Sequence, residues 1–270
     1  MANFDLDGYF RRIGFAGEAK PDLATLATLQ AAHVAAIAFE ALDPLLRRPV
    51  SLEVAEFRAK LVAGRRGGYC FEQNALFKAA LESIGFAVVG LAGRPRWNAP
   101  PDSPLGPKTH MLLSVETPEG PRLAVVGYGA CLVDVPLEFA VGREQSTPAG
   151  VLRLRESEGL HWLEARRGES WRTLYAFDLA PQRRAAYALA NWFTSTNPTP
   201  PFLNNLVLER LESGRRYKIV NRRTWTEGRD GVVEGERRIE SGADLERSLE
   251  DVFGVTPPAP ADEIFARAPE

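Results

Sequence analysis

The chain has 270 residues, of which 45% are hydrophobic and 25% are charged, a balance that is ordinary for a soluble globular protein. Its 33 basic and 35 acidic residues give a net charge of −2, which does not favour a nucleic acid or an anionic membrane as partner. No run of 18 apolar residues indicates a transmembrane helix, and the first residues lack the pattern of a signal peptide. Two cysteines and three histidines predict neither a disulfide framework nor a metal site. We therefore expect a cytoplasmic protein that uses no metal.

The N-terminal part of the chain is predicted to be mainly helical. Apolar spacing and stop signals predict helices over 23–41, over 51–62 and from Cys70 to Gly85. Beyond Gly85, short apolar runs alternate with Pro and Gly turns, which predicts an antiparallel sheet or barrel. The expected strands are 86–91, 110–116, 122–126, 132–135, 160–165 and 171–177.

The C-terminal part mixes helices and strands. A helix is expected over 184–194, and a Pro-rich break follows at 197–201. The remaining elements are expected to be strands over 206–211, 216–221 and 232–239 and a last helix over 245–253. Helices, then antiparallel strands, then a mixed region indicate an α+β fold.

The tract from Arg65 to Asn74 is the strongest functional signal in the chain. It places Cys70 shortly after a Gly-Gly pair and at the first position of a predicted helix. Unpaired N–H groups and the helix dipole at that end favour a thiolate, so we expect the pKa of Cys70 to fall. The pattern indicates a nucleophilic cysteine, although a lone cysteine is more often a small buried hydrophobe.

Three histidines are candidates for the base that a nucleophilic cysteine needs. His33 lies in an apolar helical stretch and is expected to be structural, and His161 is expected to pack in a strand. His110 begins a strand after a Pro-rich loop, so its ring can line a cleft. A cysteine on a helix and a histidine on a sheet fit the layout of cysteine acyl-transfer enzymes.

Four tracts of the sequence together resemble the arylamine N-acetyltransferase family. The tract around Cys70 matches that family's cysteine motif without change, and Thr109-His110-Met111-Leu112 matches its histidine motif. The other two tracts are His33 with 37–42, which carries two substitutions, and 195–202 with 204–207. The resemblance implies a helical bundle over 1–84, a β-barrel over 85–192 and an α/β lid over 193–270, with a cysteine-protease-like arrangement of Cys70 and His110.

The resemblance also implies a reaction. Cys70 takes the acetyl group of acetyl-coenzyme A with His110 as its base partner, and the acetyl-cysteine passes it to an arylamine or hydrazine. The implied substrate-binding residues are Phe39, Tyr128 and Phe202, and the implied coenzyme-binding residues are Thr109, Gly127 and Gly129. We expect a small-molecule amine and a coenzyme A thioester as partners and a monomer or weak homodimer.

One family residue is missing from its usual place. The triad aspartate belongs to a Val-Asp-Val-Gly-Phe-Gly tract, and Val125 occupies its position here, while Ala130 replaces a glycine. A substitute acid could orient His110, with Asp134 the nearest after the turn; Glu138 and Glu116 are others. Alternatively, a backbone carbonyl or a water orients the ring and the enzyme is slow. A third alternative is that the protein uses another acyl thioester, as amide synthases do, or only binds coenzyme A or a small molecule.

Overall fold

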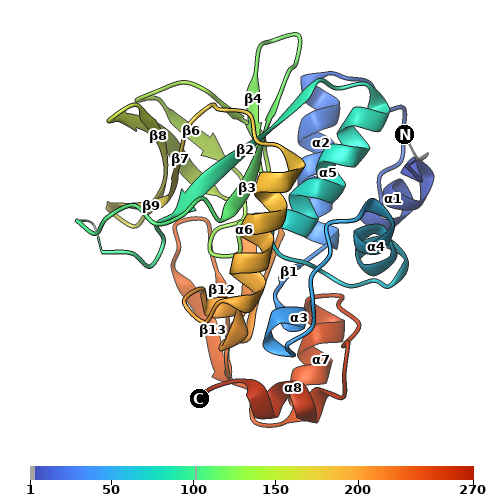
Figure 1. Ribbon diagram of the computed structural model, residues 1–270. Coiled ribbons are helices and arrows are strands. Elements are labelled where there is room, and N and C mark those ends of the chain that lie inside the picture. Colours follow the sequence, from blue (N-terminus) through green and yellow to red (C-terminus); the bar gives the residue numbers. More distant parts are fainter. Residues whose placement is uncertain (1–3, 101) are drawn as a thin grey trace.

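In the computed structural model, which describes residues 4–100 and 102–270, the helices α1, α2 and α4 pack around one central helix, α5, while the short helix α3 packs with the C-terminal elements (Figure 1). Asp22 begins the longest of the others by accepting a hydrogen bond from the Thr25 N–H at 2.8 Å. Gly85 ends α5 with a positive φ of 109°, a backbone conformation that glycine adopts without strain. The elements are α1 (Leu6–Ile13), α2 (Leu23–Ala36), α3 (Leu42–Leu45), α4 (Val54–Arg58), its π-helical continuation η1 (Ala59–Ala63) and α5 (Cys70–Ile84).

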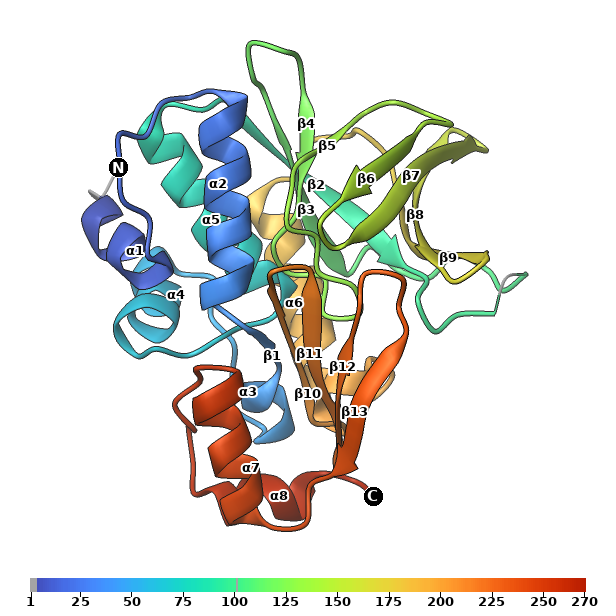
Figure 2. The same ribbon diagram turned by 180° about the vertical axis from the view of Figure 1, so that it is seen from behind.

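The middle of the chain forms one eight-stranded antiparallel sheet that curls into a nearly closed barrel (Figure 2). Its order is β5-β4-β3-β2-β9-β8-β7-β6, so β3 and β9 flank the central strand β2. The strands are β2 (Val88–Pro95), β3 (His110–Val115), β4 (Arg122–Ala124), β5 (Leu137–Glu138), β6 (Glu144–Thr147), β7 (Gly150–Ser157), β8 (Leu160–Arg167) and β9 (Ser170–Phe177). Side chains such as Leu112, Leu154 and Leu163 fill the barrel, while α5 packs on β3 from outside.

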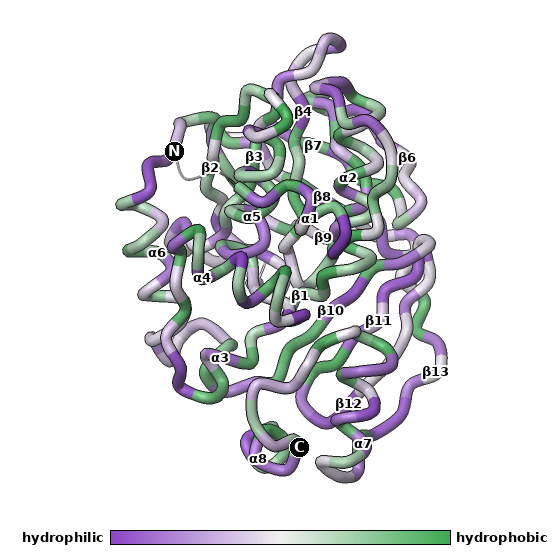
Figure 3. The backbone as a smooth tube through the Cα atoms, turned by 90° about the vertical axis from the view of Figure 1, so that its right-hand side faces the viewer, coloured by the Kyte–Doolittle hydropathy of each residue, from purple (hydrophilic) through white to green (hydrophobic). Residues whose placement is uncertain are grey.

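The C-terminal region is built on a second sheet of five strands, with order β1-β10-β11-β12-β13. Its first strand, β1 (Phe39–Glu40), comes from the N-terminal part of the chain and pairs with β10, so distant segments of the sequence meet in this sheet (Figure 2). The outermost strand, β13, is exposed and strongly hydrophilic (Figure 3). The other elements are α6 (Arg184–Thr196), the 3-10 turn η2 (Pro201–Leu203), β10 (Val207–Glu212), β11 (Arg215–Val220), β12 (Arg223–Glu227), β13 (Val233–Arg238), α7 (Gly242–Arg247), its π-helical continuation η3 (Ser248–Val252) and α8 (Ala261–Arg267).

The expected α+β fold of helical bundle, barrel and α/β lid is confirmed, whereas the three boundaries drawn in it stay predictions. The strand expected over 132–135 is wrong, because side chains from other elements hold the backbone of this segment instead of a ladder. The helix expected over 23–41 ends at Ala36, because the chain then turns to form β1. Across the described residues, no helix is both long and apolar enough to cross a membrane.

Candidate active site

Cys70 is the first residue of α5, as the sequence predicts. The Glu72 carboxylate accepts a hydrogen bond from the Tyr69 N–H at 3.2 Å, which holds the turn that enters the helix. Only 5% of Cys70 is exposed, and its Sγ lies 3.6 Å from the Thr109 carbonyl oxygen. The Met111 N–H points at the same sulfur. The thiol therefore rests on the backbone on both sides of the residue that begins β3, which is His110.

The expectation of a lowered thiol pKa is wrong for this structure. Burial raises the pKa of Cys70 to about 12, and it outweighs the N–H groups of Met111 and Phe71, which favour the thiolate. The negative charge of Glu72 raises the pKa further. The N–H groups at the helix end favour a thiolate, but burial of the sulfur has the larger effect on its pKa. Cys70 is therefore a neutral thiol at pH 7.

The ring of His110 is buried among aromatic side chains. Its centroid lies 4.8 Å from the Tyr128 ring and 4.7 Å from the Tyr175 ring. Burial lowers the pKa of His110 to about 3, so the imidazole is neutral. Its Nε2 has no hydrogen-bond partner anywhere in the described residues. The structure thus brings a neutral thiol and a neutral imidazole to the junction of α5 and β3.

The other two histidines have the structural roles expected of them. His33 is fully buried, with Nδ1 at 2.9 Å from the Tyr9 hydroxyl and Nε2 at 2.6 Å from the Gln73 side-chain oxygen. Burial lowers its pKa to about 4, so it stays neutral. His161 packs on Phe177 at a ring distance of 5.4 Å. Of the three, His110 is the histidine between Thr109 and Met111, whose backbone groups contact the Cys70 sulfur.

The Asn74 side chain joins α5 to the barrel by hydrogen bonds, a role that the sequence did not predict. Its amide nitrogen donates to the Cys70 carbonyl at 2.9 Å and to the Met111 carbonyl at 3.0 Å. Its side-chain oxygen accepts from the Val126 N–H at 3.1 Å. A polar residue four positions after Cys70 on a buried helix face was the available signal. This contact fixes the distance between α5, β3 and the segment that follows β4.

The glycines of the 127–129 turn are required by close packing. A side chain at Gly127 would start 3.0 Å from the Cys70 Cα and 2.9 Å from the Gln73 Cβ. A side chain at Gly129 would start 2.2 Å from a ring carbon of Phe39. The structure therefore places these two predicted coenzyme-binding residues against the cysteine helix and β1. Thr109, the third, holds the sulfur with its carbonyl oxygen.

The three predicted aromatic residues come from three segments, and two of them touch. Phe39 on β1 and Phe202 on η2 have ring centroids 5.9 Å apart, and Tyr69 approaches Phe202 at the same distance. Tyr128 joins the barrel side, where its hydroxyl donates to the Leu174 carbonyl at 2.5 Å. Because Gly129 packs on the Phe39 ring, the 127–129 turn links the Phe39–Phe202 pair to Tyr128.

Position 125 is a valine, and the Asp134 carboxylate does not contact His110 through a hydrogen bond. The Val125 side chain is buried in the barrel core, and its carbonyl accepts from the Gln30 amide at 3.4 Å. Asp134 lies instead beside Thr147 and Arg216, and burial raises its pKa. In the described residues, no hydrogen bond joins Asp134 to His110. The structure therefore does not bring the expected substitute acid to the imidazole.

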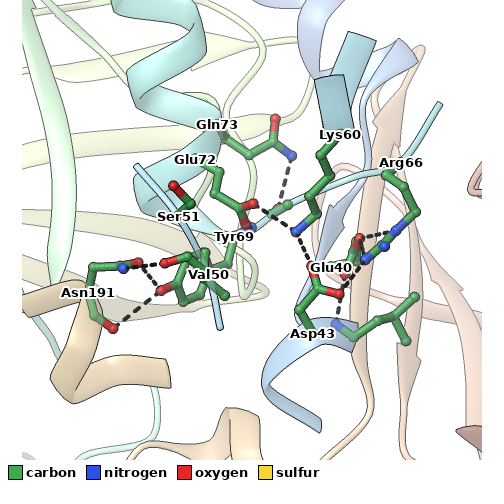
Figure 4. Close-up of polar contacts among 12 residues, drawn as sticks. Glu40, Asp43, Val50, Ser51, Lys60, Arg66, Tyr69, Glu72, Gln73 and Asn191 are labelled. Atoms are coloured by element: carbon green, nitrogen blue, oxygen red, sulfur yellow. Dashed lines mark hydrogen bonds and ion pairs between the residues drawn. The ribbon is translucent and has the colours of Figure 1, made fainter. Parts of the chain in front are cut away.

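A buried network of ion pairs, shown in Figure 4, contacts the first turn of α5 through Glu72. Arg66 donates twice to Glu40, at 2.9 and 2.6 Å, and lies 3.3 Å from Asp43. Lys60 joins Asp43 and Glu72, each at 2.7 Å. Burial raises the pKa of Glu72, and the negative charges of Glu40 and Asp43 raise it as well, while Lys60 opposes the shift. Sequence reasoning missed this network, although Arg66 and Glu72 stand within the cysteine motif.

Comparison with known proteins places this geometry in a family. A family model described as N-acetyltransferase matches residues 22–259. The chain is 37% identical to an arylamine N-acetyltransferase of Mycolicibacterium smegmatis over 254 residues, which cover 93% of this chain and 92% of the relative. It is 35% identical to that of Escherichia coli over 252 residues, 93% of this chain and 88% of the relative.

Solved structures agree with the sequence relatives. The M. smegmatis arylamine N-acetyltransferase superposes with a TM-score of 0.93 at 35% identity, covering 98% of this chain and 99% of that one. The Mycobacterium marinum enzyme in complex with CoA superposes with a TM-score of 0.92 at 34% identity, covering 98% and 99%. Sequence, fold and the Cys70 motif lead to one conclusion: this chain is an enzyme of the arylamine N-acetyltransferase family.

Proposed function

We propose that this enzyme moves an acetyl group from acetyl-coenzyme A to an arylamine or hydrazine through an acetyl-Cys70 intermediate. The observation that carries the proposal is the position of the Cys70 thiol, which contacts the backbone at the start of β3. Its Sγ lies 3.6 Å from the Thr109 carbonyl, next to the residue whose imidazole can take its proton. A buried cysteine at a helix N-terminus beside a histidine is the pair that two-step acyl transfer uses.

The first step forms the acyl-enzyme. As Cys70 Sγ attacks the thioester carbon, its proton passes to a ring nitrogen of His110. The carbon–sulfur bond to coenzyme A then breaks, and the departing sulfur takes that proton. In the second step, the amine nitrogen attacks the acetyl carbon, and its proton returns through His110 to Cys70 as the amide forms. The two steps predict ping-pong kinetics.

The burial of both groups supports a slow first step at neutral pH. Burial raises the pKa of Cys70 and lowers that of His110, so the charged thiolate–imidazolium pair is disfavoured on both sides. Val125 has no carboxylate that could offset this. We therefore infer reduced or altered activity relative to family members that carry the aspartate.

A cationic cluster around Trp97 supports a coenzyme A thioester as the donor. Arg172, Arg167 and Lys218 lie 4.2, 5.4 and 5.7 Å from the centre of its indole ring. Lys218 also donates to the Ala130 carbonyl at 2.9 Å, which joins the cluster to the turn beside Cys70. Glu227 pairs with Lys218 at 3.0 Å and with Arg167 at 3.6 Å, so Arg172 and the indole face are the groups best suited to the phosphates and the base of a nucleotide. The relative from M. marinum was solved with CoA.

The aromatic side chains support a flat amine as the acceptor. Tyr128 belongs to the 127–129 turn that packs on Cys70, and Phe39, whose ring contacts Phe202, packs on Gly129 of the same turn. Apolar rings attract aromatic amines more than aliphatic ones. We further propose a monomer or weak homodimer that works in the cytoplasm, where the unpaired Cys70 and Cys131 stay reduced.

Intact mass after incubation with acetyl-coenzyme A tests this proposal. An added mass of about 42 Da that peptide mapping assigns to Cys70 is expected, because one acetyl group replaces the thiol hydrogen. Cys70→Ala should lose the adduct, and Cys131→Ala should keep it. An adduct on Cys131 alone would overturn the assignment. An adduct with other acyl thioesters only would favour the amide-synthase-like alternative, and none with any thioester would favour a binding protein.

A further inference from the structure

Inside the barrel, the His110 ring forms a closed triangle with the rings of two tyrosines. The His110 ring lies 4.7 Å from Tyr175 and 4.8 Å from Tyr128, and the two tyrosine rings are 5.0 Å apart. Tyr175 is on β9 and His110 is on β3, with β2 between them. Gly93 of β2 stands opposite His110, and a side chain there would start 3.3 Å from the Tyr175 ring. The glycine thus leaves room for the tyrosine to reach the histidine.

The hydroxyl groups of Tyr175 and Tyr128 differ in their hydrogen bonding. The Tyr128 hydroxyl is satisfied by the Leu174 carbonyl at 2.5 Å. The Tyr175 hydroxyl and the His110 Nε2 are both buried, and neither has a partner within the described residues. An unpaired buried polar atom is costly, and a donor and an acceptor in touching rings remove that cost by pairing with each other. The centroids of the two rings lie 4.7 Å apart, so both unpaired atoms belong to rings in direct contact.

We propose that Tyr175 is the positioning residue that takes over the orienting role of the missing carboxylate, by accepting a hydrogen bond from the Nε2–H of His110. The proposal rests on the proposed function, since it assigns the residue that aligns the base of that reaction. With the proton fixed on Nε2, Nδ1 is left unprotonated to receive the Cys70 proton. A tyrosine in this apolar site stays protonated, because burial raises its pKa well above the usual value. The hydroxyl therefore orients the ring without adding a negative charge.

Tyr175→Phe removes only the hydroxyl, and Tyr187→Phe is the matched control. Tyr187 is also buried, and its hydroxyl donates to the Leu91 carbonyl at 2.9 Å on the outer side of β2. The first readout is ¹⁵N NMR of the histidine ring nitrogens, with His110 assigned by difference from His110→Gln. The wild type and Tyr187→Phe should show the Nε2–H tautomer alone, and Tyr175→Phe should show a mixture of both tautomers.

The second readout is the single-turnover rate of Cys70 acetylation. Tyr175→Phe should slow this step by roughly tenfold, the worth of one lost hydrogen bond, without raising the donor KM. Adding Val125→Asp to Tyr175→Phe should restore part of the rate, because a carboxylate can orient the same nitrogen.

An unchanged His110 tautomer in Tyr175→Phe would overturn the proposal, as would equal slowing in Tyr187→Phe. If the wild type is never acetylated, the proposed function fails, but the NMR comparison still decides whether Tyr175 holds His110.

Discussion

Asn74→Ala tests whether one amide holds the two halves of the active site together. The side chain is fully buried and makes hydrogen bonds of 2.9, 3.0 and 3.1 Å to Cys70, Met111 and Val126. The Cys70 carbonyl keeps its helical bond, but the Met111 carbonyl and the Val126 N–H lose the amide as a partner. Each buried group left unpaired costs about 1–3 kcal/mol, so we expect a loss of about 3 kcal/mol in the free energy of unfolding.

Urea unfolding followed by circular dichroism measures this loss, and Thr28→Ala on the exposed face of α2 is the control. That substitution should change the free energy of unfolding by less than about 0.5 kcal/mol. In Asn74→Ala, the loss of these hydrogen bonds lets α5 move away from β3. Single-turnover acetylation of Cys70 should therefore also slow by more than roughly tenfold in this variant. A stability loss below about 1 kcal/mol, together with an unchanged acetylation rate, would refute the reasoning.

Further predictions concern the same site. Alkylation of Cys70 by iodoacetamide should rise about tenfold per pH unit from about pH 6 to 9, because its raised pKa keeps the thiolate scarce; a plateau below about pH 7 would contradict this. Val125→Asp should shift the pH–rate profile of acetylation to lower pH, since a carboxylate stabilises the imidazolium, and an unmoved profile would count against it. Gly127→Ala should abolish acetylation while a fold remains by circular dichroism, because its Cβ would start 3.0 Å from the Cys70 Cα; wild-type activity would show that the turn can yield. Arylamines should be turned over faster than aliphatic amines of similar size, and equal rates would argue against an aromatic acceptor pocket.

The sequence predicted those parts of the site that are encoded locally. A Gly-Gly pair, a helical apolar pattern after Cys70 and a stop at Gly85 are neighbours in the chain, and α5 runs from Cys70 to Ile84 as they indicate. His110 was placed at the start of a strand for the same kind of reason, and β3 begins there.

What the sequence did not predict depends on contacts between distant segments. The pKa of Cys70 rises because Thr109, Gly127 and their neighbours bury the sulfur, and no pattern around the cysteine encodes that. The segment 132–135 has the apolar pattern of a strand. In the structure, the Gln30 amide on α2 instead donates to two of its carbonyls, at 2.9 and 3.0 Å. The approach of Tyr175 to His110 requires the order β3-β2-β9, which is a property of the whole eight-stranded sheet.

The central claim is that Cys70 carries the acetyl group on its way to the amine, and the isolated acetyl-enzyme tests it most directly. Protein acetylated on Cys70 is freed of coenzyme A, mixed with an arylamine and quenched over time, and both the protein mass and the amide are measured. We expect the acetyl group to leave Cys70 and appear on the amine at a rate no slower than steady-state turnover. An acetyl group that stays on the protein while steady-state turnover proceeds would contradict the account.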